Sequence, residues 1–237
     1  KKRILTSISL FLIVLTAIFV SKYIFVFSIF VISYLAFNEL RHLIANILRK
    51  KNKNILIFNI YIFSFLLYFL LFSIISIEIY FIEGVFFFFY ILFICIFTDI
   101  GGYVIGNLIG GKKLIKISPN KTISGSIGSF FFSIVPLIIF SNIFKNDYSF
   151  SPKEIFFCLE VSFVAQLGDL FISFIKRKGK VKDTGSILPG HGGLLDRIDG
   201  IIFAIPFIGY YLYGLSFFSY SQNFLQNFIK WKKKLQY

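Results

Sequence analysis

The chain has 237 residues, of which 57% are hydrophobic, 21% are aromatic and only 15% are charged. A soluble domain is typically about a quarter charged, so this composition excludes an ordinary soluble domain. The net charge of +14 would suggest a nucleic-acid partner in a soluble protein. Here the basic residues lie mainly in short segments between apolar runs, which is typical of cytoplasmic loops in membrane proteins. We therefore expect the lipid bilayer, and no nucleic acid, as a partner.

Apolar runs close to the ~20 residues needed to cross a bilayer follow one another along the chain. They cover residues 4–20, 23–38, 55–73, 84–98 with an extension to 110 left open, 124–144, 153–175 and 200–219. The stretch 217–229 is either an interfacial helix or half of a further span. The pattern predicts a single-domain, all-α polytopic integral membrane protein with about seven to eight transmembrane helices.

The distribution of Lys and Arg predicts the orientation of these spans. Basic residues gather at the N-terminus and in three later segments between runs, whereas the turn 77–84 carries two glutamates and no basic residue. We expect a multi-pass protein of the bacterial inner (plasma) membrane with a cytoplasmic N-terminus. The segments 99–123 and 176–199 then share the cytoplasmic face, where they can form one site. The basic tail 229–234 would fall outside after seven spans, which indicates a missed or re-entrant segment.

The run 153–175 contains a carboxylate, Asp169, in the middle of a polar stripe. Ser162, Gln166, Asp169 and Ser173 are spaced i, i+4, i+7 and i+11, so they share one helix face. Asp169 lies seven residues before Lys176, or roughly 10 Å from the interface at ~1.5 Å per residue. A carboxylate at that depth normally faces a cavity or a partner. A metal ligand or proton site is favoured, and a structural ion pair or a protonated Asp is the alternative.

Residues 176–199, "KRKGKVKDTGSILPGHGGLLDRID", combine a basic run, a glycine-rich turn and a helix start. Lys and Arg supply charge for phosphate oxygens, and the glycines let backbone N–H groups approach an anion. Asp196 and Asp199 share a helix face, and carboxylates beside a polyphosphate imply Mg²⁺ between them. His191 either binds phosphate or acts as an acid–base group, or is only a turn residue. Arg197 either binds phosphate, which is favoured, or pairs with an adjacent Asp.

The stretch "SFIKRKGKVKDTGSILPGHGGLLDRID" (173–199) resembles the signature of phosphatidate cytidylyltransferases, also called CDP-diacylglycerol synthases. The matching positions are Ser173, Lys176, Arg177, Lys182, Asp183, Pro189, His191, Gly192, Gly193, Asp196, Arg197 and Asp199. The preceding helix also matches at Gly168 and Asp169. The upstream segment 99–125 is similar but less faithful, because Ile100, Asn107 and Ser124 depart from the family pattern.

The resemblance implies that CTP and phosphatidate react to give CDP-diacylglycerol and pyrophosphate, in a catalytic portion covering 99–237 after N-terminal spans in 1–98. The implied catalytic residues are Asp169, Asp196, Asp199, Lys176 and His191. Asp169 and Asp196 would bind catalytic Mg²⁺, with a second cation left open. The implied substrate-binding residues are Arg177, Lys182, Asp183, Arg197, Ser118, Lys121, Thr122 and Asp99. The resemblance leaves a homodimer open.

Two other functions compete with this one. The first is another membrane enzyme that uses CTP, such as a polyprenol kinase or an archaeol-type cytidylyltransferase. The second is a transporter with Asp169 as its cation or proton site. Transporters often contain inverted repeats, and none is apparent in this sequence. Separately, Gly102, Gly106 and Gly110 form a GxxxG-type ridge, which is typical of close helix packing.

Overall fold

The computed structural model describes residues 15–16, 18–49, 55–115, 118–144, 150–188 and 192–214. Its α-helices are α2 (Lys22–Arg49), α3 (Ile55–Glu78), α4 (Val85–Ile109), α5 (Ile123–Ser133), α6 (Val135–Ile143), α7 (Pro152–Gly179) and α8 (Leu195–Gly209). Two π-helical turns, η1 (Ile79–Glu83) and η2 (Tyr210–Gly214), extend α3 and α8, and β1 (Lys113–Ile115) pairs with β2 (Ser118–Thr122) in an antiparallel hairpin. The predicted all-α membrane class is confirmed.

Five helices within the described residues are long and apolar enough to cross a membrane. They cover Lys22–Leu48, Ile55–Glu83, Val85–Ile109, Ile123–Ile143 and Pro152–Gly179. Each matches an expected run, and α4 continues to Ile109, so the proposed extension of the fourth run is confirmed. Most of the run 4–20 and the whole stretch 217–229 lie outside the described residues. The total number of spans therefore stays a prediction.

Two of the expected runs have an interrupted structure. The run 124–144 breaks between α5 and α6 at Ile134, and Pro136 lies in the first turn of α6. Proline fits that position because its missing N–H would have no partner in the first helical turn. The described part of the run 200–219 consists of the last ten residues of α8, with Pro206 among them, followed by η2.

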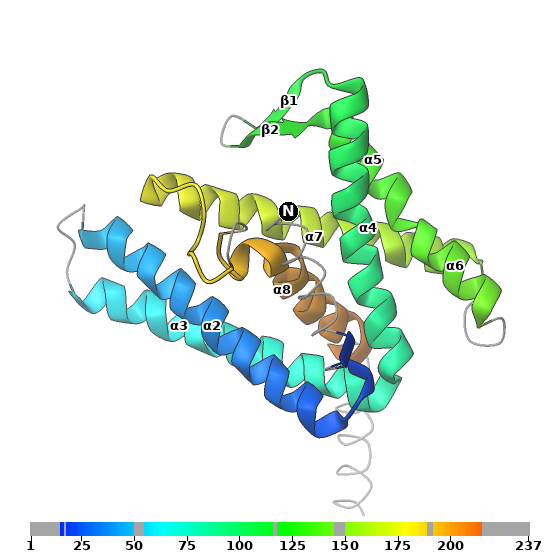
Figure 1. The fold of residues 1–237 in the computed structure, drawn as a ribbon, viewed down its shortest axis with the longest axis horizontal. Helices are drawn as coiled ribbons and strands as arrows, with labels where there is room; N and C mark the ends of the chain where they lie inside the picture. The colour runs from blue at the N-terminus through cyan, green and yellow to red at the C-terminus, as the bar shows by residue number, and fades with distance from the viewer. Residues whose placement is uncertain are drawn as a thin grey trace, which may run out of the picture.

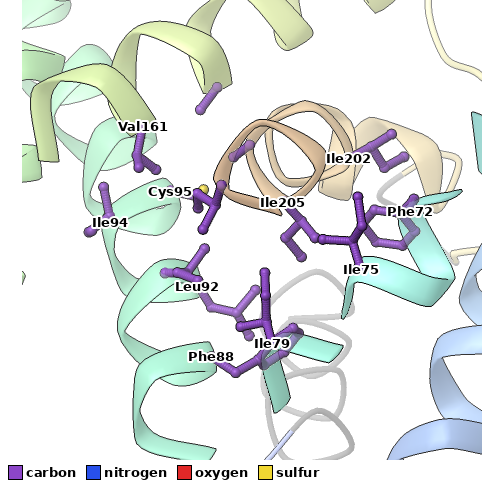
Figure 2. Close-up of a cluster of buried hydrophobic side chains, with 14 of the residues drawn as sticks. Phe72, Ile75, Ile79, Phe88, Leu92, Ile94, Cys95, Val161, Ile202 and Ile205 are labelled. Atoms are coloured by element: carbon purple, nitrogen blue, oxygen red, sulfur yellow. The ribbon is translucent and has the colours of Figure 1, made fainter. Parts of the chain in front are cut away.

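The helix α8 lies at the centre of the arrangement, with α2 and α3 on one side, α4 on the other and α7 across it (Figure 1). Its inner face meets α3, α4 and α7 in one buried apolar cluster (Figure 2). Ile202 and Ile205 of α8, Ile79 of η1, Cys95 of α4 and Val161 of α7 are each no more than 2% exposed. In lipid, such close packing is a main force between helices. The cluster therefore holds the middle of α8 against α3, α4 and α7.

The helices α4 and α5 approach each other through small residues. A Cβ atom on Gly125 would lie 2.7 Å from the Gly102 carbonyl oxygen and 3.2 Å from the Gly106 Cα. Gly102 and Gly106 thus take the expected role in close packing. Gly110 has a different role, because it ends α4 with a φ of 65°, and a Cβ added there would meet no atom within 4 Å. The close approach brings the hairpin β1–β2, which lies between the two helices in sequence, beside the end of α4.

Candidate active site

A cavity of about 400 Å³ lies among α4, α5, α7, the first turns of α8 and the hairpin β1–β2. Its lining includes Asp99 from α4, Lys121 from β2, Asp169 from α7 and Asp199 from α8. The two polar segments 99–123 and 176–199 therefore meet at one site, as expected from the sequence. The lining combines acidic, basic and hydroxyl side chains.

The polar stripe of α7 faces this cavity and α5. Asp169 forms an ion pair with Lys121, and the Ser173 hydroxyl lies 3.4 Å from the other carboxylate oxygen. One turn earlier, Ser126 of α5 donates a hydrogen bond of 2.5 Å to the Gln166 side-chain oxygen. The Gln166 amide lies 3.4 Å from the hydroxyl of Ser162. The stripe predicted from spacing is thus polar because it lines a cavity, and Asp169 also makes the ion pair considered as an alternative.

Three carboxylates from three helices surround one part of the cavity. Asp99, Asp169 and Asp199 lie close enough that each interacts electrostatically with the other two. Lys121 and Arg197 contribute positive charge near Asp99. Asp199 is only 8% exposed, and one of its oxygens accepts a hydrogen bond from the Gly200 N–H. Negatively charged carboxylates that interact with one another repel unless a cation or a proton lies among them. The cluster therefore suits a positively charged ligand.

Asp196 has a different environment from Asp169. One of its oxygens accepts a hydrogen bond of 2.6 Å from Lys176. The other accepts from the N–H groups of Thr184 and Gly193, at 2.8 and 3.1 Å, and lies 3.0 Å from the Thr184 hydroxyl. Burial raises the pKa of this carboxyl, but the Lys176 ammonium and the two N–H donors outweigh it, so the pKa lies below its ordinary value.

These contacts bear on the expected pairing of Asp169 with Asp196 as metal ligands. The Asp196 oxygens are engaged by its own loop and by Lys176, whereas the acidic neighbours of Asp169 are Asp99 and Asp199. Among the described residues, no group of three or more His, Cys, Asp or Glu side chains forms a ready-made metal site. The metal pair stays a prediction.

The other expected residues divide into three groups. Ser118, Lys121 and Thr122 line the cavity, and the Thr122 hydroxyl also caps α5 by accepting from the Gly125 N–H. The side chains of Arg177, Lys182, Asp183 and Arg197 are exposed, and they do not line the cavity. His191 lies outside the described residues, with its neighbours Pro189 and Gly190.

The three departures from the family pattern also lie away from the cavity lining. Ile100 and Asn107 have exposed side chains on α4. Ser124 donates a hydrogen bond to the Gly110 carbonyl and lies 3.0 Å from the Thr122 hydroxyl, so it joins the two ends of the hairpin. Ser124 therefore holds the end of α4 close to the start of α5.

Sequence reasoning missed one buried acid, Glu39 of α2, which is 4% exposed. Its carboxylate accepts hydrogen bonds of 2.9 Å from the backbone N–H groups of Leu194 and Leu195 and from the Thr184 hydroxyl. The signal that could have found it is the one that singled out Asp169, an acidic residue adjoining a long apolar run.

Comparison with known proteins gives the context for this site. The phosphatidate cytidylyltransferases of Bacillus subtilis and Staphylococcus aureus (strain COL) are 41% and 43% identical to the chain over 133 and 129 residues. The protein of the same name from Rickettsia bellii is 42% identical over 132 residues. These matches cover 52–53% of this chain and 48%, 48% and 57% of the relatives. The chain thus spans about half the length of the curated relatives it matches. A model of the cytidylyltransferase family matches residues 41–215, most of the chain, so this protein belongs to the cytidylyltransferase family.

Proposed function

We propose that the protein is a phosphatidate cytidylyltransferase, which transfers CMP from CTP to phosphatidate and yields CDP-diacylglycerol and pyrophosphate. The observation that carries the proposal is the cavity in which Asp99, Asp169 and Asp199 face Lys121 among membrane-spanning helices. Relatives of that name are 41–43% identical over about half of the chain, which supports the same activity.

The position of the cavity suits one lipid and one water-soluble substrate. Asp169 lies within a spanning helix, about two turns before its basic end at Lys176 and Arg177. A lipid phosphate lies at the membrane interface, so its oxygens can reach that depth from the bilayer. CTP would enter from the aqueous side past the hairpin and the exposed basic residues. We place this side, together with the N-terminus, on the cytoplasmic face of a bacterial inner membrane. The Lys and Arg distribution supports the orientation, and the bacterial relatives support the choice of membrane.

In the proposed reaction, a phosphatidate phosphate oxygen attacks the α-phosphorus of CTP. A new P–O bond forms there while the bond to the β-phosphate oxygen breaks, and pyrophosphate leaves with the electron pair. The nucleophile is already anionic, so the site needs alignment and charge neutralisation more than a strong base. Lys121 is placed to neutralise a phosphate in the cavity, and Arg197 adds positive charge near Asp99.

We also propose a divalent cation, Mg²⁺, as cofactor. The carboxylates of Asp99, Asp169 and Asp199 supply the oxygen ligands that hard cations prefer, and all three line the same cavity. Bound there, the ion would screen the carboxylates from the phosphates and stabilise the charge of the transferring group. Asp196, which also lines the cavity, stays a predicted ligand of this ion, and a second cation is left open.

The test is a transfer assay on purified protein in detergent. With α-labelled CTP, phosphatidate and Mg²⁺, label should enter the lipid phase, and EDTA should prevent this. With γ-labelled CTP, label should leave as pyrophosphate and none should enter lipid. A polyprenol kinase would give the opposite pattern, with γ-label in polyprenol, and that result would overturn the proposal. Light scattering on the same preparation tests the homodimer.

A further inference from the structure

We propose that Glu39 is the positioning residue that fixes the described parts of the signature loop (residues 180–188 and 192–194) and the start of α8 for catalysis. The inference rests on the proposed function and deepens it, because it assigns a role to the N-terminal helix α2. Glu39 lies before residues 41–215, the part of the chain that matches the family model. The evidence for its role therefore comes from the tertiary structure, in which α2 packs against α7 and α8.

The carboxylate of Glu39 binds the first N–H groups of α8. One oxygen accepts from Leu194 and the other from Leu195, each at 2.9 Å. These N–H groups lie at the N-terminus of the helix, where backbone donors have no partner inside the helix. The helix dipole also favours a negative charge there. Leu194 itself has no side-chain cap for α8, so the cap comes from a residue about 155 positions earlier.

The Thr184 hydroxyl connects this cap to the rest of the site. It lies 2.9 Å from a Glu39 oxygen and 3.0 Å from an Asp196 oxygen. The Thr184 N–H donates to the same Asp196 oxygen at 2.8 Å, so Thr184 connects the two carboxylates whichever of them its hydroxyl bonds. Asp196 in turn holds Lys176 of α7 at 2.6 Å. One continuous hydrogen-bond network therefore runs from α2 through the loop and α8 to the end of α7.

The same carboxylate explains two glycines of the loop. A Cβ on Gly185 would lie 2.6 Å from a Glu39 oxygen. A Cβ on Gly193 would collide with the other Glu39 oxygen and with the Thr184 hydroxyl. Positions 185 and 193 thus need glycine because the loop folds tightly around the Glu39 carboxylate.

The consequence for the site follows from the geometry of α8. Asp199 lies one helical turn after Leu195, whose N–H is held by Glu39. Fixing the first turn therefore fixes the direction in which Asp199 faces Asp99 and Asp169. Small displacements of reacting groups cost large factors in rate, so a helix start that moves freely would lower turnover.

The test compares Glu39→Gln with Glu160→Gln, a matched change at another acid of a spanning helix. One Glu160 oxygen is buried without a hydrogen-bond partner, and the residue lies outside the cavity lining. In Glu39→Gln, one carboxylate oxygen becomes an NH₂ group, which cannot accept a hydrogen bond and faces the N–H or O–H groups that donate to the carboxylate in the wild type. We expect hydrogen exchange within 184–196 to be about tenfold faster, with exchange in α4 and α5 unchanged. Glu160→Gln should leave both unchanged.

Exchange is measured in detergent without substrate, so this result stands even if the proposed transfer reaction fails. In the transfer assay, kcat for Glu39→Gln should fall roughly 10- to 100-fold, with KM for CTP changed less than about threefold. Glu39→Asp, which keeps the carboxylate, should recover part of the rate. Unchanged exchange in 184–196, or a loss of rate equal to the loss of folded protein, would overturn the positioning role.

A second variant serves if Glu39→Gln does not fold. Thr184→Val removes only the hydroxyl between Glu39 and Asp196 and keeps the shape of the side chain. It should accelerate exchange in the same segment by a smaller factor. Wild-type exchange and kcat in Thr184→Val would also contradict the network.

Discussion

The buried pair of Lys176 and Asp196 allows a quantitative test of how the loop is held. We consider Asp196→Asn, which keeps the size of the side chain and removes its charge. The Lys176 and Asp196 side chains are only 13% and 8% exposed, and their charged atoms lie 2.6 Å apart. Removing one partner of a buried pair costs ~3–5 kcal/mol, because the other charge stays buried. We expect about 3 kcal/mol here, since Lys176 retains some contact with solvent.

The assay is unfolding of the purified protein in detergent, with a double-mutant cycle that adds Lys176→Met. If the cost comes from the unpaired ammonium, Lys176→Met in the Asp196→Asn background should restore most of the lost stability. The coupling energy should then reach about 2 kcal/mol. The pair Lys121–Asp169 is the comparison, because both side chains are 28% exposed, and its coupling should be smaller. Additive effects of the two changes at 176 and 196 would refute the reasoning.

Three further predictions follow from the same geometry. The pKa of Asp196 lies below its ordinary value, so its stabilisation is present above the unfolded pKa of about 3.9 and is lost as pH falls through the folded pKa. The stability difference between wild type and Asp196→Asn should therefore shrink in acid, and a pH-independent difference would contradict this. Gly125→Val should destabilise the protein by about 3 kcal/mol, because its Cβ would lie 2.7 Å from the Gly102 carbonyl oxygen. Gly179→Ala, whose nearest contact would be an ordinary 3.6 Å, should be tolerated in the same thermal unfolding experiment. Asp169→Asn should lower CMP transfer by roughly 10²–10³-fold and keep the folded state. Near-wild-type transfer in that variant would remove Asp169 from the reaction.

Local patterns in the sequence carried much of the fold. Hydropathy and run length predicted each of the five spans among the described residues. Spacing along α7 predicted the stripe of Ser162, Gln166 and Asp169, because the 3.6-residue period places these positions on one face. Pro136 marks the break between α5 and α6, although the sequence alone reads as one continuous run. These features depend on neighbours within a few turns, which is the range over which sequence patterns act directly.

The composition of the site depended on packing between distant segments. The sequence predicted that segments 99–123 and 176–199 share a face, and the structure brings Asp99, Lys121 and Asp199 around Asp169. It did not predict that Asp196 would be engaged by Lys176 and its own loop. Helical spacing predicts which side chains share a face of one helix, but it does not predict which faces of different helices pack together.

Glu39 is the clearest case of this limit. Its hydrogen-bond partners lie 145 to 156 residues later in the chain, and no local pattern connects them. The sequence by itself determined that a carboxylate beside an apolar run must find a partner, because burying an unpaired charge is costly. Only the tertiary structure decided that the partners are the first N–H groups of α8, since the packing of α2 on α7 and α8 brings them within reach.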